Sequence, residues 1–144
     1  MGVIVDDVFF CGDSVFAPEV WQRLILIYAV DIGEMIASIE RLKRVGAKSF
    51  IASHVTPTDD IEELASINLA KIQMLIDDIL HILSTPAETA TVLWEICKRH
   101  GLAIRTIQQY YLCLDTLKAY LSYLLEEGLI AYEFDANRLM WKTI

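Results

Sequence analysis

The sequence predicts an α/β domain followed by a small α+β domain, and two observations support this prediction. Over residues 1–84, short β-branched and aromatic runs alternate with helical periodicities, which favours a sheet covered by helices. Over residues 85–144, helical periodicities are followed by two final strand-like runs. We therefore expect one domain at 1–84 and a second at 85–144, divided at Ser84-Thr85-Pro86.

The first domain begins with a predicted β-hairpin. Residues 2–6 and 8–11 are strand-like, and Asp6-Asp7 forms the turn between them. A loop or short helix over 14–30 follows, and a clear amphipathic helix then starts at Asp31. Two strands and one covering helix are therefore expected in the first part of this domain.

A third strand and a long helix complete the first domain. Residues 48–54 alternate in the strand pattern and end in His54. Thr58 is the expected N-cap of the next helix, and the acids at 59–63 suit the positive end of its dipole. This helix is expected to run to Leu83, and its wide apolar stripe predicts packing on two sides.

The second domain contains three predicted helices and a terminal hairpin. Thr85-Pro86-Ala87-Glu88 is a capping box with proline at the first helical position, so a helix is expected from Pro86 to His100. The other predicted elements are helices over 106–111 and 114–127 and strands over 129–134 and 138–144. Three helices followed by a hairpin is the order of a winged-helix domain.

Composition argues against several classes of function. The chain has 144 residues, a net charge of −8 and a mean hydropathy of +0.42, and no apolar run reaches the roughly 18 uncharged residues of a membrane helix. Residues 1–84 carry 13 acids and 6 bases and residues 85–144 carry 7 and 6, so neither part has the basic surface typical of nucleic-acid binding. The N-terminus shows no secretory signal pattern, and three cysteines without a zinc spacing predict free thiols in the cytoplasm. We expect neither a membrane nor a nucleic acid among the partners.

The sharpest local pattern is a strand that ends in Gly12-Asp13, followed by a small polar residue and two apolar ones. A second strand, Phe50-Ile-Ala-Ser-His54, ends in a histidine 41 positions after Asp13. A carboxylate has two oxygens and can span two cations, while glycine lets the backbone turn sharply into a site. Asp13 and His54 therefore each stand at the end of a predicted strand.

These two motifs resemble the fourth and fifth metal-ligand motifs of the metallo-β-lactamase superfamily. The resemblance implies the second half of that family's αββα fold, followed by a winged-helix domain as in its glyoxalase-II-like members. It also implies that Asp13 bridges two metal ions, with zinc as the expected metal, and that His54 completes the second metal site. The implied activity is metal-dependent hydrolysis of an ester, thioester, amide or phosphoester.

The sequence also departs from the family's pattern. The His-x-His-x-Asp-His signature is absent, the histidine motif before the Gly-Asp strand is missing, and Val55 replaces the usual glycine after the last ligand. Two ligands fall short of the three or four that zinc sites use, so we expect a truncated hydrolase that is inactive alone. A small-molecule substrate is expected only where the site is complete.

Two other functions remain open from the sequence. The apolar content of 55% suggests a protein-interaction module, which would form a homo-oligomer or bind the missing N-terminal half. The winged-helix order suggests a nucleic-acid-binding regulator, although the third predicted helix carries three acids and one lysine, a poor mix for phosphate contact. Asp13 alone is also explained as a turn residue, and His81 and His100 are expected to be structural.

Overall fold

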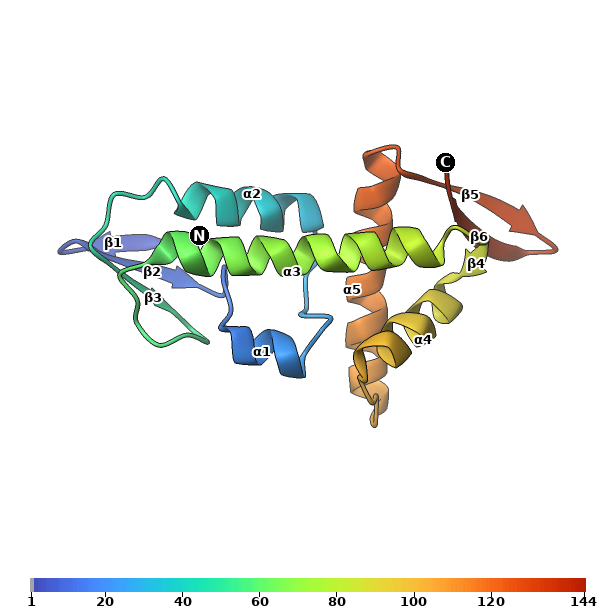
Figure 1. Cartoon of the computed structure of the whole chain (residues 1–144), viewed down its shortest axis with the longest axis horizontal. Coiled ribbons are helices and arrows are strands. Elements are labelled where there is room, and N and C mark those ends of the chain that lie inside the picture. The colour runs from blue at the N-terminus through green and yellow to red at the C-terminus, as the bar shows by residue number, and fades with distance from the viewer. Residues whose placement is uncertain (1) are drawn as a thin grey trace. The chain divides into compact units, whose positions relative to one another are not determined.

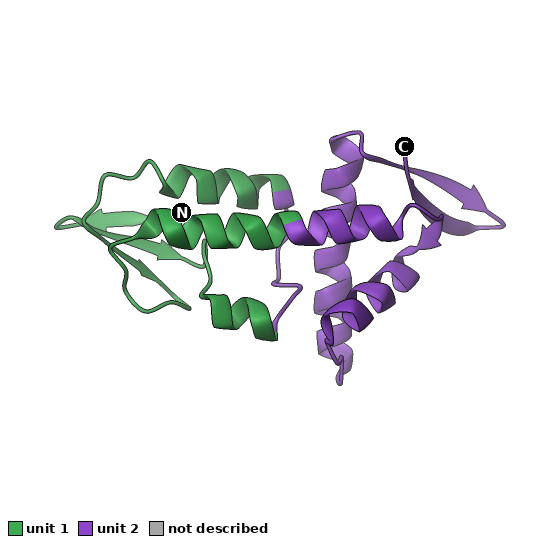
Figure 2. Cartoon of the chain, in the orientation of Figure 1, with its two compact units in different colours: residues 1–23, 33–73 green, residues 24–32, 74–144 purple. Residues whose placement is uncertain are grey.

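The computed structural model describes residues 2–144 (Figure 1). In chain order the elements are β1 (Val3–Val5), β2 (Val8–Gly12), α1 (Pro18–Arg23), α2 (Ile32–Leu42), β3 (Ser49–Ala52), α3 (Ile61–Ile82), β4 (Ala87–Glu88), α4 (Thr89–His100), α5 (Ile107–Glu126), β5 (Ile130–Asp135) and β6 (Arg138–Thr143). The chain divides into two compact units, one of residues 1–23 and 33–73 and one of residues 24–32 and 74–144 (Figure 2). This division falls within α3. The domain boundary expected at residues 84–86 stays a prediction.

The first unit is built on a three-stranded sheet in the order β1-β2-β3. β1 and β2 form the predicted hairpin, and the turn residues Asp6 and Asp7 have φ of 48° and 66°, as a type I′ turn requires. β3 runs parallel to β2, and the N–H groups of Lys48 and Ser49 donate to the Asp7 carbonyl. The carboxyl ends of the two parallel strands therefore lie together at one edge of the sheet.

One face of this sheet is largely buried at β2 and β3, although Ile4 on the same face is 54% exposed, and the other face is not covered. Phe9 and Phe50 are paired across β2 and β3 and meet edge to face at 6.1 Å between ring centroids, on the side where Cys11 and Ala52 are buried. The opposite face carries five apolar side chains that are exposed or half-buried, namely Val3, Val5, Val8, Phe10 and Ile51. A solvent-facing sheet surface is normally polar, so an apolar one marks a surface that another layer covers.

The helix that follows β3 begins later than predicted. α3 starts at Ile61, and its N-cap is Asp60 rather than Thr58, because Asp60 Oδ1 accepts the Glu63 N–H at 2.9 Å. Thr58 instead exchanges two backbone hydrogen bonds with Phe50, at 2.8 and 3.0 Å. No helix within residues 2–144 is long and apolar enough to cross a membrane.

The second unit contains the second part of α3, α4, α5 and a sheet in the order β4-β6-β5. The predicted capping box is wrong, because Ala87 and Glu88 pair with Trp141 and Met140 as a short strand. α4 therefore starts at Thr89, whose hydroxyl oxygen accepts the Trp141 indole N–H at 3.0 Å. A long-range strand pairing thus delays the start of this helix by three residues from the predicted Pro86.

The prediction of two helices over 106–111 and 114–127 is also wrong, because α5 is a single helix. Thr106 caps it as expected, accepting the Gln109 N–H at 3.1 Å. The helix continues without a break through Leu112 and Cys113, a pair with no glycine or proline to end it. Its buried side is apolar apart from Thr116, and it ends before Gly128, which has a φ of 69°.

Candidate functional site

Asp13 follows directly on β2, at a bend made by Gly12. Gly12 has a φ of 59°, in the left-handed region that glycine adopts without strain. The Ser53 N–H donates to the Gly12 carbonyl at 3.0 Å, and the Ser14 hydroxyl donates to the Cys11 carbonyl at 2.8 Å. These bonds join the end of β2 to the end of β3 and hold the backbone on both sides of Asp13.

His54 lies two residues beyond the end of β3, beside Asp13. Its Nε2 atom is 3.6 Å from Asp13 Oδ1, and the two side chains are 54% and 68% exposed. Both residues follow strands that run parallel, so they reach the same edge of the sheet. The structure therefore brings together the two residues that the motifs singled out, at a position open to solvent.

A buried asparagine on α3, which sequence analysis did not single out, anchors the loop that carries Asp13. Asn68 Oδ1 accepts the Phe16 N–H at 3.0 Å and the Trp21 indole N–H at 2.9 Å. Its Nδ2 donates to the carbonyls of Phe16 and Leu64, at 2.9 and 2.8 Å. All four hydrogen bonds of the carboxamide are made, so the segment from Phe16 to Trp21 is tied to α3. An asparagine within the apolar stripe of a helix is the signal that could have identified it.

Phe16 connects this anchor to His54. The two rings are stacked, with centroids 5.7 Å apart and planes 13° apart. On another side Phe16 meets Trp21 edge to face, at 6.4 Å and 85°. Within residues 2–144, Asp13 is the only charged partner of His54. The imidazole is therefore held by one aromatic contact and one carboxylate.

An imidazole and a carboxylate are ligand types that zinc and related transition metals bind, but two ligands are fewer than a zinc site uses. Structural zinc sites use four protein ligands and catalytic ones three. Among residues 2–144 no group of three or more histidine, cysteine, aspartate or glutamate side chains could hold a metal ion. The residues described here fit part of a metal site rather than a whole one, and a metal-binding role for Asp13 and His54 stays a prediction.

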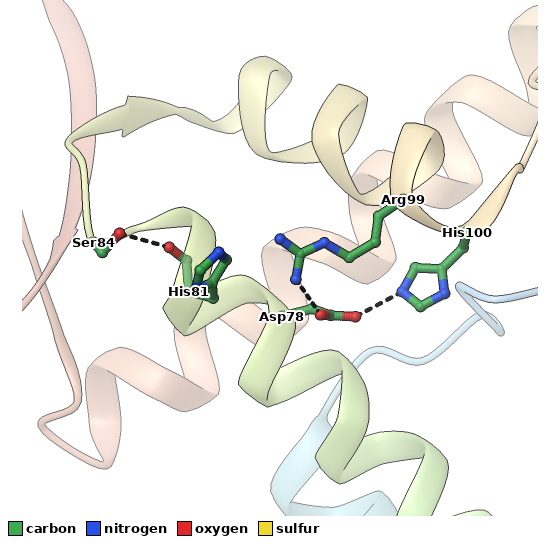
Figure 3. A network of polar contacts seen from close by, with 5 residues as sticks. All are labelled: Asp78, His81, Ser84, Arg99 and His100. Atoms are coloured by element: carbon green, nitrogen blue, oxygen red, sulfur yellow. Dashed lines mark hydrogen bonds and ion pairs between the residues drawn. The ribbon is translucent and has the colours of Figure 1, made fainter.

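The other two histidines lie in the second unit (Figure 3). His100 Nε2 contacts Asp78 Oδ2 at 2.7 Å, and Arg99 pairs with the other oxygen of the same carboxylate. The backbone carbonyl of His81 accepts the Ser84 hydroxyl at 2.7 Å. The Asp78 carboxylate thus connects α3 to the end of α4, which agrees with the structural role expected for His100.

Comparisons with known proteins show the fold. No protein-family model matches the chain, and no curated protein matches it in sequence. A metallo-β-lactamase family protein from Thermus thermophilus has a similar structure, with a TM-score of 0.71 and 17% identity over 96% of this chain and 42% of that one. A β-lactamase domain protein from Burkholderia ambifaria is similar with a TM-score of 0.75 and 15% identity, over 95% of this chain and 41% of that one. The chain therefore has the fold of part of these proteins and spans about two fifths of their length.

Proposed function

We propose that this chain is the C-terminal part of a metal-dependent hydrolase of the metallo-β-lactamase superfamily, in which Asp13 and His54 are two of the metal ligands. The observation that carries the proposal is the 3.6 Å separation of Asp13 Oδ1 and His54 Nε2 at the ends of two parallel strands. The structural likeness to a metallo-β-lactamase family protein and to a β-lactamase domain protein supports the same assignment. In the complete site Asp13 would bridge two metal ions, His54 would complete the second site, and zinc is the metal we expect.

The reaction class follows from this type of site. With carboxylate and imidazole ligands such as Asp13 and His54, bound metal ions would supply a nucleophile from water at neutral pH and electrostatic stabilisation of the substrate. Esters, thioesters, amides and phosphoesters are the substrates we consider. Because a catalytic zinc site uses at least three protein ligands, we expect residues 1–144 by themselves to have no hydrolytic activity. Metal-dependent turnover by this polypeptide would contradict that expectation.

Zinc titration followed by NMR tests the ligand assignment. We expect the resonances of Asp13 and His54 to shift first and furthest, and the variants Asp13→Asn and His54→Gln each to abolish the shift. Asp59→Asn and His81→Gln are matched controls, because they change an exposed acid and an exposed histidine elsewhere in the chain. Zinc-induced shifts that survive in both site variants would reject the assignment.

The uncovered apolar face of the β1-β2-β3 sheet supports the proposal that another polypeptide layer packs on it. Val3, Val5 and Phe10 on that face are 59%, 52% and 44% exposed. Two sheets pack through apolar faces about 10 Å apart, so a second sheet is the layer that this surface fits. More than half of each similar structure lies outside the matched part. We infer that polypeptide equivalent to that remainder, in the same chain or in a separate one, covers the face and brings the missing ligands.

A homo-oligomer is the competing occupant of this face, and sedimentation distinguishes the two. We expect the chain to be monomeric and to bind a hydrophobic dye, with dye binding reduced in Phe10→Lys. Phe134→Lys is the control, because Phe134 is also exposed but lies on β5. Dimers that form with concentration and disappear only in Phe10→Lys would instead assign the face to a second copy.

The element order of the second unit supports the winged-helix proposal. The second part of α3, the strand β4, two further helices and a terminal hairpin follow one another, and the sheet order is β4-β6-β5. The basic side chains of its hairpin and of α5 are paired with acids: Arg138 with Asp135, Lys142 with Glu133 and Lys118 with Asp115. Neutralised cations are poor phosphate ligands, so we expect packing against protein rather than nucleic acid. A fluorescence anisotropy change with mixed duplex DNA that weakens as salt rises would contradict this.

A reducing compartment such as the cytoplasm is the proposed location. Cys11, Cys97 and Cys113 are all free thiols. Unpaired thiols are the usual state of cysteine in reducing compartments. We expect three reactive thiols per unfolded chain when the protein is isolated without reductant and titrated in denaturant.

A further inference from the structure

We propose that Phe16, held in place by Asn68, is a positioning residue that sets the orientation of the His54 imidazole. The proposal rests on the proposed function, because it concerns how His54 presents a ring nitrogen to a ligand. It gives a role to two side chains to which the metal-ligand motifs assign none. Three steps lead to it: the hold on the Phe16 backbone, the stack of the two rings, and the direction of the imidazole nitrogen.

The first step is the hold of Asn68 on Phe16. One carboxamide accepts the Phe16 N–H at 3.0 Å and donates to the Phe16 carbonyl at 2.9 Å, so it binds both backbone polar groups of one residue. The Trp21 indole N–H and the Leu64 carbonyl take its remaining acceptor and donor. The carboxamide has only one orientation that satisfies these partners, because exchanging its oxygen and nitrogen would place donors against donors. Asn68 is fully buried, so water does not compete for these bonds.

The second step is the contact between the rings. Phe16 and His54 lie with planes 13° apart and centroids 5.7 Å apart, an offset-stacked arrangement. Trp21 meets Phe16 edge to face and is itself buried, so the Phe16 ring is enclosed on that side. The Phe16 backbone is fixed and its ring is packed. The plane that it offers to His54 is therefore fixed as well.

The third step is the direction of the imidazole nitrogen. The lone pairs of an imidazole lie in the plane of the ring, so the plane of Phe16 selects the directions in which His54 can bind a ligand. In the structure Nε2 of His54 points toward Asp13, the other candidate ligand. Metal-binding histidines are usually oriented by a hydrogen bond from the second ring nitrogen. Within residues 2–144, Asp13 is the one polar partner of His54, so the stack supplies the orientation that such a bond gives elsewhere.

The variant Phe16→Leu tests the proposal with two readouts. In the metal-free wild-type chain we expect upfield ring-current shifts of the His54 ring protons and nuclear Overhauser contacts between them and the Phe16 ring, both lost in Phe16→Leu. We also expect the zinc affinity at His54 to fall by about 10- to 100-fold, the usual cost of removing a group that orients a metal ligand. Phe16→Tyr keeps the ring and should restore both. Phe9→Leu is the matched control, because it removes a phenylalanine ring of β2 that contacts Phe50 and not His54.

The outcomes separate this proposal from the ligand assignment. An unshifted His54 ring in the wild-type chain, or a zinc affinity equal in Phe16→Leu and wild type, overturns the positioning role. If the wild-type chain binds no zinc, the ligand assignment fails and the metal-free NMR contacts alone decide. A His54 ring orientation unchanged by Phe16→Leu then overturns the proposal, and an altered orientation supports it. Phe16→Met takes the place of Phe16→Leu if the leucine variant disturbs the fold.

Discussion

At the residue scale, Asn68 decides how firmly the first unit is held together. Replacing it by aspartate keeps the shape but turns a donor into an acceptor that faces the carbonyls of Phe16 and Leu64. We expect Asn68→Asp to lower the free energy of unfolding by roughly 1–3 kcal/mol, because the buried Phe16 carbonyl is left without a donor, whereas the Leu64 carbonyl keeps its bond within α3. Urea denaturation measures the change. Ser66→Ala, at an exposed position of the same helix, should stay within about 0.5 kcal/mol of wild type.

Asp78 makes the corresponding connection in the second unit. Its side chain is only 15% exposed and holds both Arg99 and His100 (Figure 3). We expect Asp78→Asn to destabilise the protein by about 1–3 kcal/mol, because hydrogen bonds to a shielded charge are stronger than those at the surface. Asp115→Asn breaks an exposed pair with Lys118 and should cost less than about 1 kcal/mol. Thermal unfolding followed by circular dichroism compares the two variants. Equal losses of stability would show that the shielded Asp78 contacts contribute no more than an exposed ion pair.

At the element scale, the two hairpins have turns of the same geometry with residues that suit it unequally. Ala136 and Asn137 have φ of 47° and 66°, close to the values of the Asp6-Asp7 turn. The left-handed region costs a typical L-residue about 1–2 kcal/mol, and asparagine and aspartate tolerate it better than alanine does. We expect Ala136→Gly to raise the free energy of unfolding by about 0.5–1 kcal/mol in urea denaturation, since relief of strain outweighs the added chain entropy. Ala131→Gly, within β5, should lower it, and a gain at both positions would contradict the explanation.

Helix boundaries show which features of an element a sequence can specify. The sequence predicts helix ends at His100 and at residue 127, and each is followed by a glycine with left-handed φ, Gly101 at 65° and Gly128 at 69°. These ends depend on the chemistry of one residue and its neighbours. The start of α4 was mispredicted because Ala87 pairs with Trp141. No local pattern reveals a partner that lies more than fifty positions away.

At the scale of the whole molecule, one part of the candidate site can be predicted from the sequence and another part cannot. The approach of Asp13 to His54 could be anticipated, because each follows a strand and parallel neighbours end at one edge. The support beneath them could not, because Asn68 bonds Trp21 and Phe16 across 47 and 52 positions of sequence. Within a helical pattern, that asparagine indicates only that some partner must satisfy it. The two residues of the candidate site are therefore visible in sequence motifs, whereas the contacts that hold the loop beside them arise from packing.

The whole molecule is also expected to lose stability in alkaline solution. Burial raises the pKa of the Cys11, Cys97 and Cys113 thiols above their ordinary value of 9.0 and that of the Tyr120 phenol above 10.0. The stability that depends on these protonated groups is fully present below about pH 9, where folded and unfolded chains both keep the protons. It is lost as the pH rises through the folded pKa values, because the unfolded chain then binds fewer protons than the folded one.

Tyr120→Phe isolates the phenol's share of this alkaline loss. Urea denaturation at about pH 8, 9, 10 and 11 should show a free energy of unfolding that falls less steeply in the variant than in wild type, since the linkage slope scales with the difference in bound protons. Tyr132→Phe, at an exposed position on β5, is the control for removal of a hydroxyl. If Tyr120→Phe and wild type have the same slope, the buried phenol is not a source of the loss. The thiols would then have to account for it, and replacing each cysteine by alanine in turn would identify which one does.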